Sequence, residues 1–288
     1  MFDIIADSAC DFTPEMAQKM GVEIVPFYVS LDGEHYRKEG KEIAVRDFYQ
    51  FMVDNPSAYP KTSLPSLEDF ETVFRAHAEA GRPMLCICFT SKMSGCVGSA
   101  RNARELVLED FPDAKIEVID STAATVTESI VVENAVAMRD AGCTLDEAVT
   151  WLEAEKITNQ IFFTVGNLDY LIKGGRIGKV TGRAANILGI KPSLAVVGGE
   201  LKVMKKYRGS LPICVGKYIT DRLVERDDIE DSLVFISSCQ PKPGCMEAIK
   251  AGLRQYGNFE NVYETDIGTT IGGYSGPGTI GIVFARKQ

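Results

Sequence analysis

Short apolar runs alternate with amphipathic stretches through the first 157 residues. The runs have the length and content of buried strands, and the stretches between them show helical spacing of apolar positions. The predicted strands are Ile4–Ala6, Val22–Val29, Met84–Phe89 and Lys115–Ile119. The predicted helices are Pro14–Met20, Ala44–Val53, Leu67–Ala80, Ala100–Leu108, Ser129–Ala141 and Leu145–Glu155. This alternation predicts a parallel sheet with helices on both faces.

Two of these helices have recognisable start signals. Thr13 precedes Pro14, which is the pattern of an N-cap followed by proline at the first helical position. Ser66 is followed three residues later by Asp69, as in a capping box. Both signals support the predicted helix boundaries.

The second half of the chain has a different pattern. The predicted strands are Gln160–Val165, Lys191–Val197, Glu200–Lys206, Ser232–Ser237 and Thr279–Phe284, and the predicted helices are Leu168–Lys173, Ser210–Val224 and Cys245–Tyr256. Gly198-Gly199 between two strands is a strong hairpin signal, and a hairpin within an α/β pattern implies a mixed sheet. We therefore expect two α/β domains, residues 1–157 with the parallel sheet and residues 158–288 with the mixed one.

The net charge of the 288-residue chain is −9. This acidic balance argues against a nucleic-acid or membrane-surface binder, because either needs a basic face. No run of eighteen apolar residues occurs, so stable membrane insertion is not expected. The chain begins with a strand-like segment that lacks the basic and apolar regions of a signal peptide, and a cytoplasmic location is expected.

Eight cysteines are scattered along the chain, with no C-x-x-C pair, and His35 and His77 are the only histidines. Tetrahedral zinc sites usually show closely paired ligands, so no metal site is expected. The cysteines are interpreted as reduced, small apolar residues of a cytosolic protein.

Two hydroxyl-rich segments lie about thirty residues apart: Lys61-Thr62-Ser63-Leu64-Pro65-Ser66 and Thr90-Ser91-Lys92-Met93-Ser94-Gly95. The second follows a predicted strand and leads into a predicted helix, so hydroxyls and backbone N–H groups converge at a helix N-terminus, which suits an anion. Gly95 also allows the backbone to approach a ligand closely.

Two further polar loops, Asp7–Asp11 and Asp120–Thr122, follow strands of the same predicted sheet. Ligands bind beyond the carboxyl ends of parallel strands, so the three loops together predict a polar crevice. The alternative for each loop alone is that its polar residues only cap a helix.

The chain offers little support for catalysis at this crevice. A nucleophilic Ser94 would need a positioned base, and neither histidine is expected near it. The segment Gly174–Val180 fails the spacing of a phosphate-binding P-loop and is interpreted as a tight turn before a helix. Arg176, Lys179 and Arg183 would give that turn a cationic face for a phosphate or an acidic partner. The glycine-rich segment Gly272–Gly278 is expected either to bring its backbone close to a ligand or to form a structural loop.

In their order along the chain, several motifs resemble those of the DegV family of bacterial proteins. They are Ile5-Ala6-Asp7-Ser8-Ala9-Cys10-Asp11-Phe12, Val25-Pro26, Lys61–Ser66, Thr90–Gly95, Val118-Ile119-Asp120-Ser121, Leu168–Ile177, Ile190-Lys191-Pro192 and Gly276-Pro277-Gly278. Each motif alone is weak, but the ordered set covers nearly the whole chain.

The resemblance implies a two-domain α/β protein that binds one long-chain fatty acid, such as palmitate, in a tunnel. By motif, Thr62 and Ser94 correspond to the residues that hold the carboxylate, and Arg176 to a contact with a kinase partner or the transferred phosphate. Ser63, Gly95 and Ser275 are predicted to complete the ligand site.

In that family a separate ATP-dependent fatty acid kinase collects the ligand, so the resemblance implies a carrier without chemistry or a cofactor of its own. The alternative is an enzyme or phosphotransfer subunit that acts on a small anionic metabolite. Two positions differ from the family pattern: Tyr274 stands where a histidine is usual, and a tyrosine-to-aspartate element is altered at Tyr36–Gly40.

Apolar residues that could line such a tunnel are also present. The candidates are Ile161, Phe162, Phe163, Ile187, Leu188, Ile280 and Ile282, each with ordinary core as the alternative.

Overall fold

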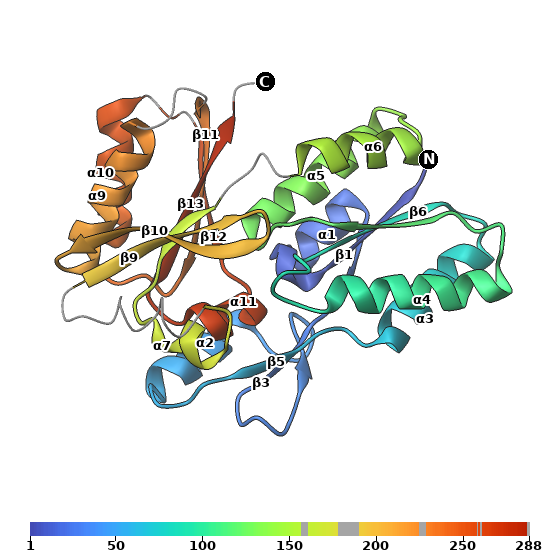
Figure 1. Ribbon diagram of the computed structural model, residues 1–288, viewed down its shortest axis with the longest axis horizontal. Helices are drawn as coiled ribbons and strands as arrows, with labels where there is room; N and C mark the ends of the chain where they lie inside the picture. The colour runs from blue at the N-terminus through green and yellow to red at the C-terminus, as the bar shows by residue number, and fades with distance from the viewer. Residues whose placement is uncertain (157–160, 178–189, 225–228, 258, 260, 287–288) are drawn as a thin grey trace.

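The computed structural model describes residues 1–156, 161–177, 190–224, 229–257, 259 and 261–286. Two large sheets lie side by side, one formed by the first part of the chain and one by the last (Figure 1). The fold is α/β with a parallel and a mixed sheet, as predicted from the sequence. The proposed domain boundary at residue 157 lies outside the described residues and stays a prediction.

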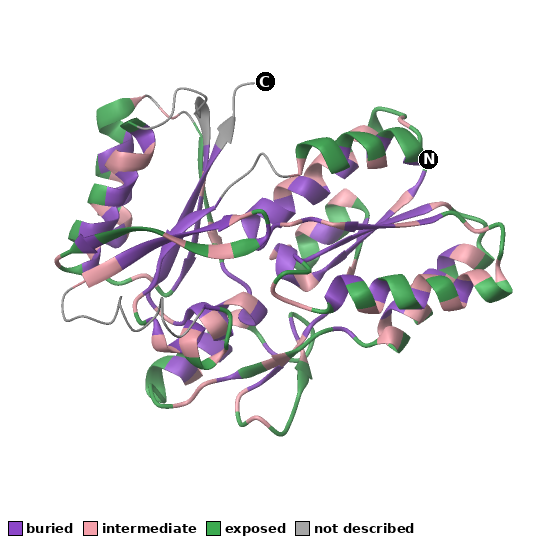
Figure 2. Ribbon diagram, in the orientation of Figure 1, coloured by how far each residue is buried: buried purple, intermediate pink, exposed green. Residues whose placement is uncertain are grey.

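The first sheet contains β1 (Asp3–Asp7), β2 (Val22–Val25), β6 (Met84–Cys88) and β7 (Ile116–Asp120) in the order β2-β1-β6-β7. All neighbours are parallel. The side chains of Ile4 and Ile5 point to opposite faces and join different clusters of buried residues, as the two-residue period of a strand requires. Both clusters are packed, so the strands are buried on both sides (Figure 2).

Helices α3 (Leu67–Glu79) and α4 (Cys96–Asp110) cover the face of this sheet that includes Ile5. Helices α5 (Val126–Asp140) and α6 (Leu145–Glu155) cover the face that includes Ile4. The short η1 (Ser8–Cys10) and α1 (Pro14–Met20) connect β1 to β2. Both helix-start signals are confirmed: the Thr13 hydroxyl accepts from the Met16 N–H, and Ser66 forms a capping box with Asp69.

The second sheet is mixed, with the order β10-β9-β8-β13-β11-β12. Its strands are β8 (Phe162–Thr164), β9 (Ile190–Val197), β10 (Glu200–Arg208), β11 (Ile229–Cys239), β12 (Asn261–Asp266) and β13 (Thr279–Arg286). Gly198 and Gly199 form the predicted hairpin turn between β9 and β10, both with positive φ. Helices α9 (Leu211–Val224) and α10 (Cys245–Tyr256) cover one face, and the other face looks toward the first sheet (Figure 1).

The predicted strand Val22–Val29 is in fact two strands, because Pro26 has no N–H for a continuous ladder. The second part, β3 (Tyr28–Ser30), pairs with β4 (Arg37–Lys38) and β5 (Lys61–Ser63) in a small antiparallel sheet. Helix α2 (Val45–Asp54) lies between β4 and β5 in the sequence. The first hydroxyl-rich segment therefore begins as a strand.

The glycine-rich segment near the C-terminus was expected either to bring its backbone close to a ligand or to form a structural loop, and its first part belongs to helix α11 (Thr269–Ser275). Glycine disfavours helix, and tertiary contacts override that preference here. The Glu39 carboxylate accepts hydrogen bonds from the Thr269 hydroxyl (2.8 Å) and the Thr270 N–H (2.7 Å) at the first turn.

Gly272 of α11 leaves room for a tyrosine from a distant element. A Cβ atom at Gly272 would overlap the Tyr49 hydroxyl, which donates to the Ile267 carbonyl over 2.6 Å. A Cβ atom at Gly276 would likewise overlap the Tyr170 ring. The glycines of this segment therefore allow close packing of tyrosine side chains.

Among the described residues, no helix has the length and apolar content needed to cross a bilayer.

Candidate functional site

A cavity of about 490 Å³ lies between the hydroxyl-rich loop Thr90–Gly95 and the face of the mixed sheet that looks toward the first sheet. This volume is within the range of about 300–1,000 Å³ typical of ligand pockets. Most of its wall is apolar, contributed by Phe27, Leu64, Phe89, Met93, Ala124, Ile161, Phe163, Leu171, Val196, Leu201, Ile267 and Ile271. The cavity is therefore suited to an elongated apolar ligand with a small polar group.

Strand alternation decides which of the predicted tunnel residues reach this cavity. Ile161 and Phe163 line it. Phe162, Ile280 and Ile282 point to the opposite face of the sheet, where they pack in the core beneath α9 and α10. Ile187 and Leu188 lie outside the described residues.

Ser94 lies in the loop between β6 and α4, directly before Gly95, the N-cap residue of α4. The Ser94 hydroxyl accepts a hydrogen bond from the Cys96 N–H over 3.2 Å and is half-buried. Ser94 and Gly95 both line the cavity. The predicted arrangement of a hydroxyl at a helix N-terminus is thus present in the fold.

Thr62 lies on β5 and lines the same cavity, together with the exposed Ser63. Its hydroxyl donates to the phenol oxygen of Tyr274 over 3.1 Å. The two hydroxyl-rich segments therefore meet at one cavity, although one begins as strand β5 of the small sheet and the other is the loop that follows β6 of the first sheet.

Tyr274 is held between Thr62 and Arg176. The Arg176 guanidinium lies over the tyrosine ring, 4.3 Å from its centroid, and donates to the Gly174 carbonyl over 2.7 Å. Gly174 has no room for a side chain, because a Cβ atom there would overlap the Tyr274 ring. The predicted helix after this turn, with Lys179 and Arg183, lies outside the described residues.

A smaller cavity of about 300 Å³ adjoins the first at these residues. Thr62, Arg176 and Tyr274 line both cavities. The smaller one is also lined by Lys61 and Lys173, and the Lys173 ammonium lies 3.5 Å from the centroid of the Tyr59 ring. This outer cavity is therefore cationic, whereas the inner one is mainly apolar.

Two buried hydroxyls in the inner cavity have no hydrogen-bond partner within the described protein. They belong to Ser275 and Thr125, which are 4% and 3% exposed. A buried hydroxyl without a partner costs about 1–3 kcal/mol, so both are available to a polar ligand atom. Ser275 was predicted from the sequence, but Thr125 was not. Thr125 has a φ of 54°, which a β-branched residue rarely adopts, and no sequence signal indicates this.

The other two strand-end loops do not line the cavity, in contrast to the predicted three-loop crevice. The Asp7 carboxylate is buried and accepts from the N–H groups of Ala9 (2.9 Å) and Phe89 (2.7 Å). Asp120 accepts from the N–H groups of Ser91 (3.2 Å) and Thr122 (3.0 Å). These aspartates therefore stabilise the loop that carries Ser94 and do not face the ligand space.

A family model described as an uncharacterised protein of the DegV family matches residues 1–287. The chain belongs to the DegV family. A DegV domain-containing protein of Streptococcus pyogenes serotype M1 is 31% identical over 283 residues, covering 98% of this chain and 96% of the relative.

Solved structures are also similar. A stearic acid-binding protein from Eubacterium ventriosum is 38% identical, with a TM-score of 0.88 and coverage of 100% of this chain and 99% of the other. A DegV family protein from Thermus thermophilus, whose structure is described as showing fatty acid binding, is 26% identical with a TM-score of 0.82, and 99% of each chain is covered.

This DegV protein also contains a group of buried acids and thiols beneath the Ser94 loop. Burial, followed by the charge of Cys88, raises the pKa of Asp7 to about 7. Burial also raises the pKa of Glu128 well above its usual value, and the nearby charges of Asp7 and Cys88 add to the effect. Both carboxyl oxygens of Glu128 lack a hydrogen-bond partner within the described protein.

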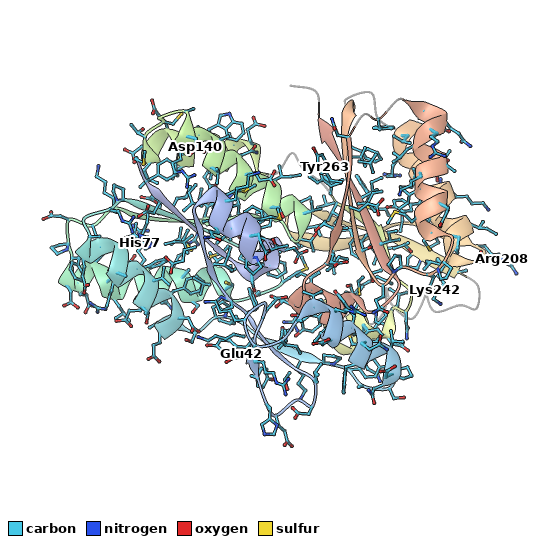
Figure 3. The ribbon with its side chains drawn as sticks, turned by 180° about the vertical axis from the view of Figure 1, so that it is seen from behind. Glu42, His77, Asp140, Arg208, Lys242 and Tyr263 are labelled. Atoms are coloured by element: carbon cyan, nitrogen blue, oxygen red, sulfur yellow. The ribbon has the colours of Figure 1, made fainter. Side chains whose placement is uncertain are left out.

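Neither histidine of this DegV protein lines the cavity. His77 lies on α3, on the side of the first sheet away from the mixed sheet, and its ring nitrogens lie 2.7 Å from Asp3 and 2.8 Å from Glu23 (Figure 3). His35 is exposed and contacts Asp32. The cavity hydroxyls therefore lack the neighbouring imidazole that would activate a serine nucleophile.

Proposed function

We propose that this DegV protein binds one long-chain fatty acid non-covalently, with the carboxylate held by Thr62 and Ser94 and the acyl chain in the apolar cavity. The observation that carries the proposal is that the hydroxyls of Thr62, Ser94 and Ser275 line one cavity whose remaining wall is mostly apolar. The fatty acid binding of the Eubacterium ventriosum and Thermus thermophilus relatives supports the same ligand class.

The free energy of binding would come mainly from the acyl chain. A sixteen-carbon acid has about fourteen methylenes, and burial at about 0.8 kcal/mol each gives about 11 kcal/mol before the costs of association. The carboxylate contributes orientation, because hydroxyl and backbone N–H donors satisfy its charge. The mainly apolar wall favours this ligand over the small anionic metabolite of the alternative hypothesis.

Solvent extraction of the purified protein followed by mass spectrometry tests the ligand class. We expect about one long-chain fatty acid per chain, either as purified or after incubation with palmitate or oleate, because one cavity holds one ligand. Absence of a fatty acid under both conditions would contradict the proposal.

The roles of Thr62 and Ser94 are tested by the double variant Thr62→Ala with Ser94→Ala. Loss of two hydrogen bonds to a charged group should weaken palmitate binding about tenfold or more. The control is Ser57→Ala with Thr150→Ala, which removes two exposed hydroxyls outside the cavity. Equal affinity of the two double variants would place the carboxylate elsewhere.

We also propose that a separate fatty acid kinase collects the bound ligand at the cationic outer cavity. The exposed Arg176, with Lys61 and Lys173 nearby, offers positive charge where a phosphate would meet the carboxylate end of the ligand. In a coupled assay with a fatty acid kinase, Arg176→Glu should lower the phosphorylation rate by a larger factor than it lowers palmitate affinity. Equal factors would argue against a direct role toward the kinase or phosphate.

A further inference from the structure

Three sulfur and oxygen ligand atoms converge beneath the loop that carries Ser94. The carboxylate of Asp7 and the thiols of Cys88 and Cys96 have ligand atoms that all lie within 4.8 Å of one another. The Cys96 thiol lies 3.2 Å from Asp7 Oδ2. All three residues are completely buried.

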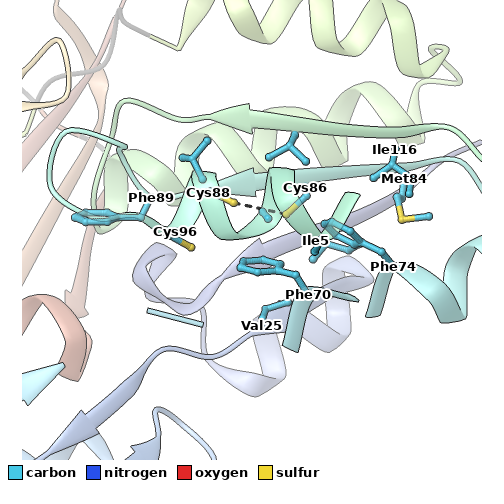
Figure 4. Packing of buried hydrophobic residues seen from close by; sticks show 14 of the residues in the cluster. Ile5, Val25, Phe70, Phe74, Met84, Cys86, Cys88, Phe89, Cys96 and Ile116 are labelled. Carbon is cyan, nitrogen blue, oxygen red and sulfur yellow. Dashed lines mark hydrogen bonds between the residues drawn. The ribbon is translucent and has the colours of Figure 1, made fainter. Parts of the chain in front are cut away.

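Two further residues with a thiol or a carboxyl group belong to the same region. Cys86 precedes Cys88 by two residues on β6, and their sulfur atoms lie 3.7 Å apart (Figure 4). Glu128, at the start of α5, is completely buried, interacts electrostatically with Asp7 and Cys88, and has no hydrogen-bond partner for either carboxyl oxygen within the described protein. An unpartnered buried carboxyl is costly unless something outside the described protein satisfies it.

We propose that Asp7, Cys88 and Cys96 bind a zinc ion, with Glu128 as the fourth ligand. Zinc takes thiolate and carboxylate ligands in a tetrahedron, with bond lengths of about 2.0–2.3 Å that separate neighbouring ligand atoms by about 3.3–3.8 Å. The Cys96 sulfur lies 3.2 Å from Asp7 Oδ2, and the ligand atoms of Asp7, Cys88 and Cys96 all lie within 4.8 Å of one another, which is close to this spacing.

The charge of the group favours the same ion. A divalent cation offsets part of the cost of burying two thiolates and two carboxylates together, and the thiol and carboxyl protons leave to solvent as the metal binds. Mixed sulfur and oxygen ligation excludes magnesium and calcium as the preferred ions, because both favour oxygen alone.

The ion would join the first sheet to the ligand site. Asp7 ends β1, Cys88 ends β6 and Cys96 begins α4, so one ion would connect three elements around the loop 89–95. The Cys96 N–H donates to the Ser94 hydroxyl. The zinc site would thus fix the N-terminus of α4, where Ser94 lies. No metal site was expected from the sequence, because these ligands come from four separate segments and show no paired spacing.

Elemental analysis of protein produced in zinc-supplemented medium tests the site. We expect about one zinc per chain in the wild type and less than about a tenth in Cys88→Ser with Cys96→Ser, since a structural site loses its metal with its thiolates. The matched control is Cys214→Ser with Cys245→Ser, two buried cysteines near α9 and α10 that should leave the zinc content unchanged. Wild-type protein without zinc, or an equal content in both double variants, would overturn the proposal.

A second measurement starts from the wild-type protein, so its main readout does not need a folded variant. Wild-type protein refolded with Co²⁺ should show thiolate-to-cobalt charge-transfer absorption, which Glu128→Gln should shift by changing the fourth ligand. Refolded wild type without that absorption, or with a Cys88–Cys96 disulfide in place of free thiols, would contradict the zinc site. Neither readout uses fatty acid binding, so the site can fail while the proposed function holds.

Discussion

The Thr62 hydroxyl donates to the phenol oxygen of Tyr274 over 3.1 Å, and this hydrogen bond joins β5 to α11 between the apolar and the cationic cavity. Arg176 covers the tyrosine ring. Tyr274 therefore contacts the threonine proposed to hold the carboxylate.

Removal of the phenol oxygen by Tyr274→Phe should weaken palmitate binding about three- to tenfold, which corresponds to one hydrogen bond of about 0.5–1.5 kcal/mol. Isothermal titration calorimetry measures this change. Tyr256→Phe, at an exposed position on α10, is the control and should bind like the wild type. A wild-type affinity for Tyr274→Phe would show that the Thr62–Tyr274 hydrogen bond does not orient the ligand site.

Gly174→Ala should displace the Tyr274 ring, because the added Cβ atom would overlap it. We expect a loss of unfolding free energy of about 1–3 kcal/mol, typical of an overpacked site, together with weaker palmitate binding. Gly98→Ala is the matched control: it lies within α4, where an added Cβ has no neighbour within 4 Å. That variant should gain up to about 1 kcal/mol of helix stability, as judged by denaturant unfolding.

Glu39→Gln should destabilise the N-terminus of α11. The carboxylate accepts from the hydroxyls of Ser8, Thr269 and Thr270 and from the Thr270 N–H, and an amide cannot accept all four. We expect a loss of about 2–3 kcal/mol in urea unfolding. Glu34→Gln, an exposed substitution, should stay within about 0.5 kcal/mol of the wild type.

The buried acids predict that the metal-free protein loses stability as the pH rises. Asp7 has a pKa raised to about 7, and burial raises the pKa values of Asp11 and Glu128 as well, so the folded state holds protons that the unfolded state releases near pH 4. The stability from Asp7 protonation is complete below about pH 4 and is lost as the pH rises through about 7.

Urea unfolding of the metal-free protein, in the presence of a chelator, should therefore show an unfolding free energy that falls between about pH 5 and about pH 8, by an amount on the order of a few kcal/mol. Asp7→Asn should flatten this slope, because the amide does not titrate. Asp113→Asn, at an exposed position, is the control. An unchanged slope in Asp7→Asn would indicate that Asp7 ionises alike in both states.

Phe70→Ala tests the core beneath α3. The ring is completely buried against the first sheet, so its removal should cost about 3–5 kcal/mol of unfolding free energy. Trp151→Ala removes a larger but 42% exposed ring and should cost clearly less, and denaturant unfolding compares the two. Equal losses would contradict the assignment of Phe70 to the core.

Most strands and helices could be predicted because their apolar periods agree with their final burial. Helices Leu145–Glu155 and Cys245–Tyr256 have the predicted bounds. Strand β12 was missed because its side chains are mostly exposed, so the residues show no buried period. Helix α11 was missed because its start depends on Glu39, more than two hundred residues earlier.

The candidate site could be predicted only in part, because some of its features also depend on contacts between distant segments. Thr62, Ser94 and Arg176 lie in motifs that a resemblance can identify, and the structure brings them to one cavity. Thr125 and the Thr62–Tyr274 hydrogen bond depend on backbone geometry and on pairing between distant segments, which no local pattern records. The role of these residues in ligand binding stays a prediction.

The packing of Tyr49 against Gly272 has a consequence for how the chain can change. Because a tyrosine from another segment occupies the space of the absent side chain, neither residue can be replaced alone without an overlap or a void. The same holds for Tyr170 with Gly276. A larger residue at either glycine is compatible with the fold only when its tyrosine shrinks in the same chain. Each pair therefore couples the substitutions that the fold can accept at two segments far apart in the sequence.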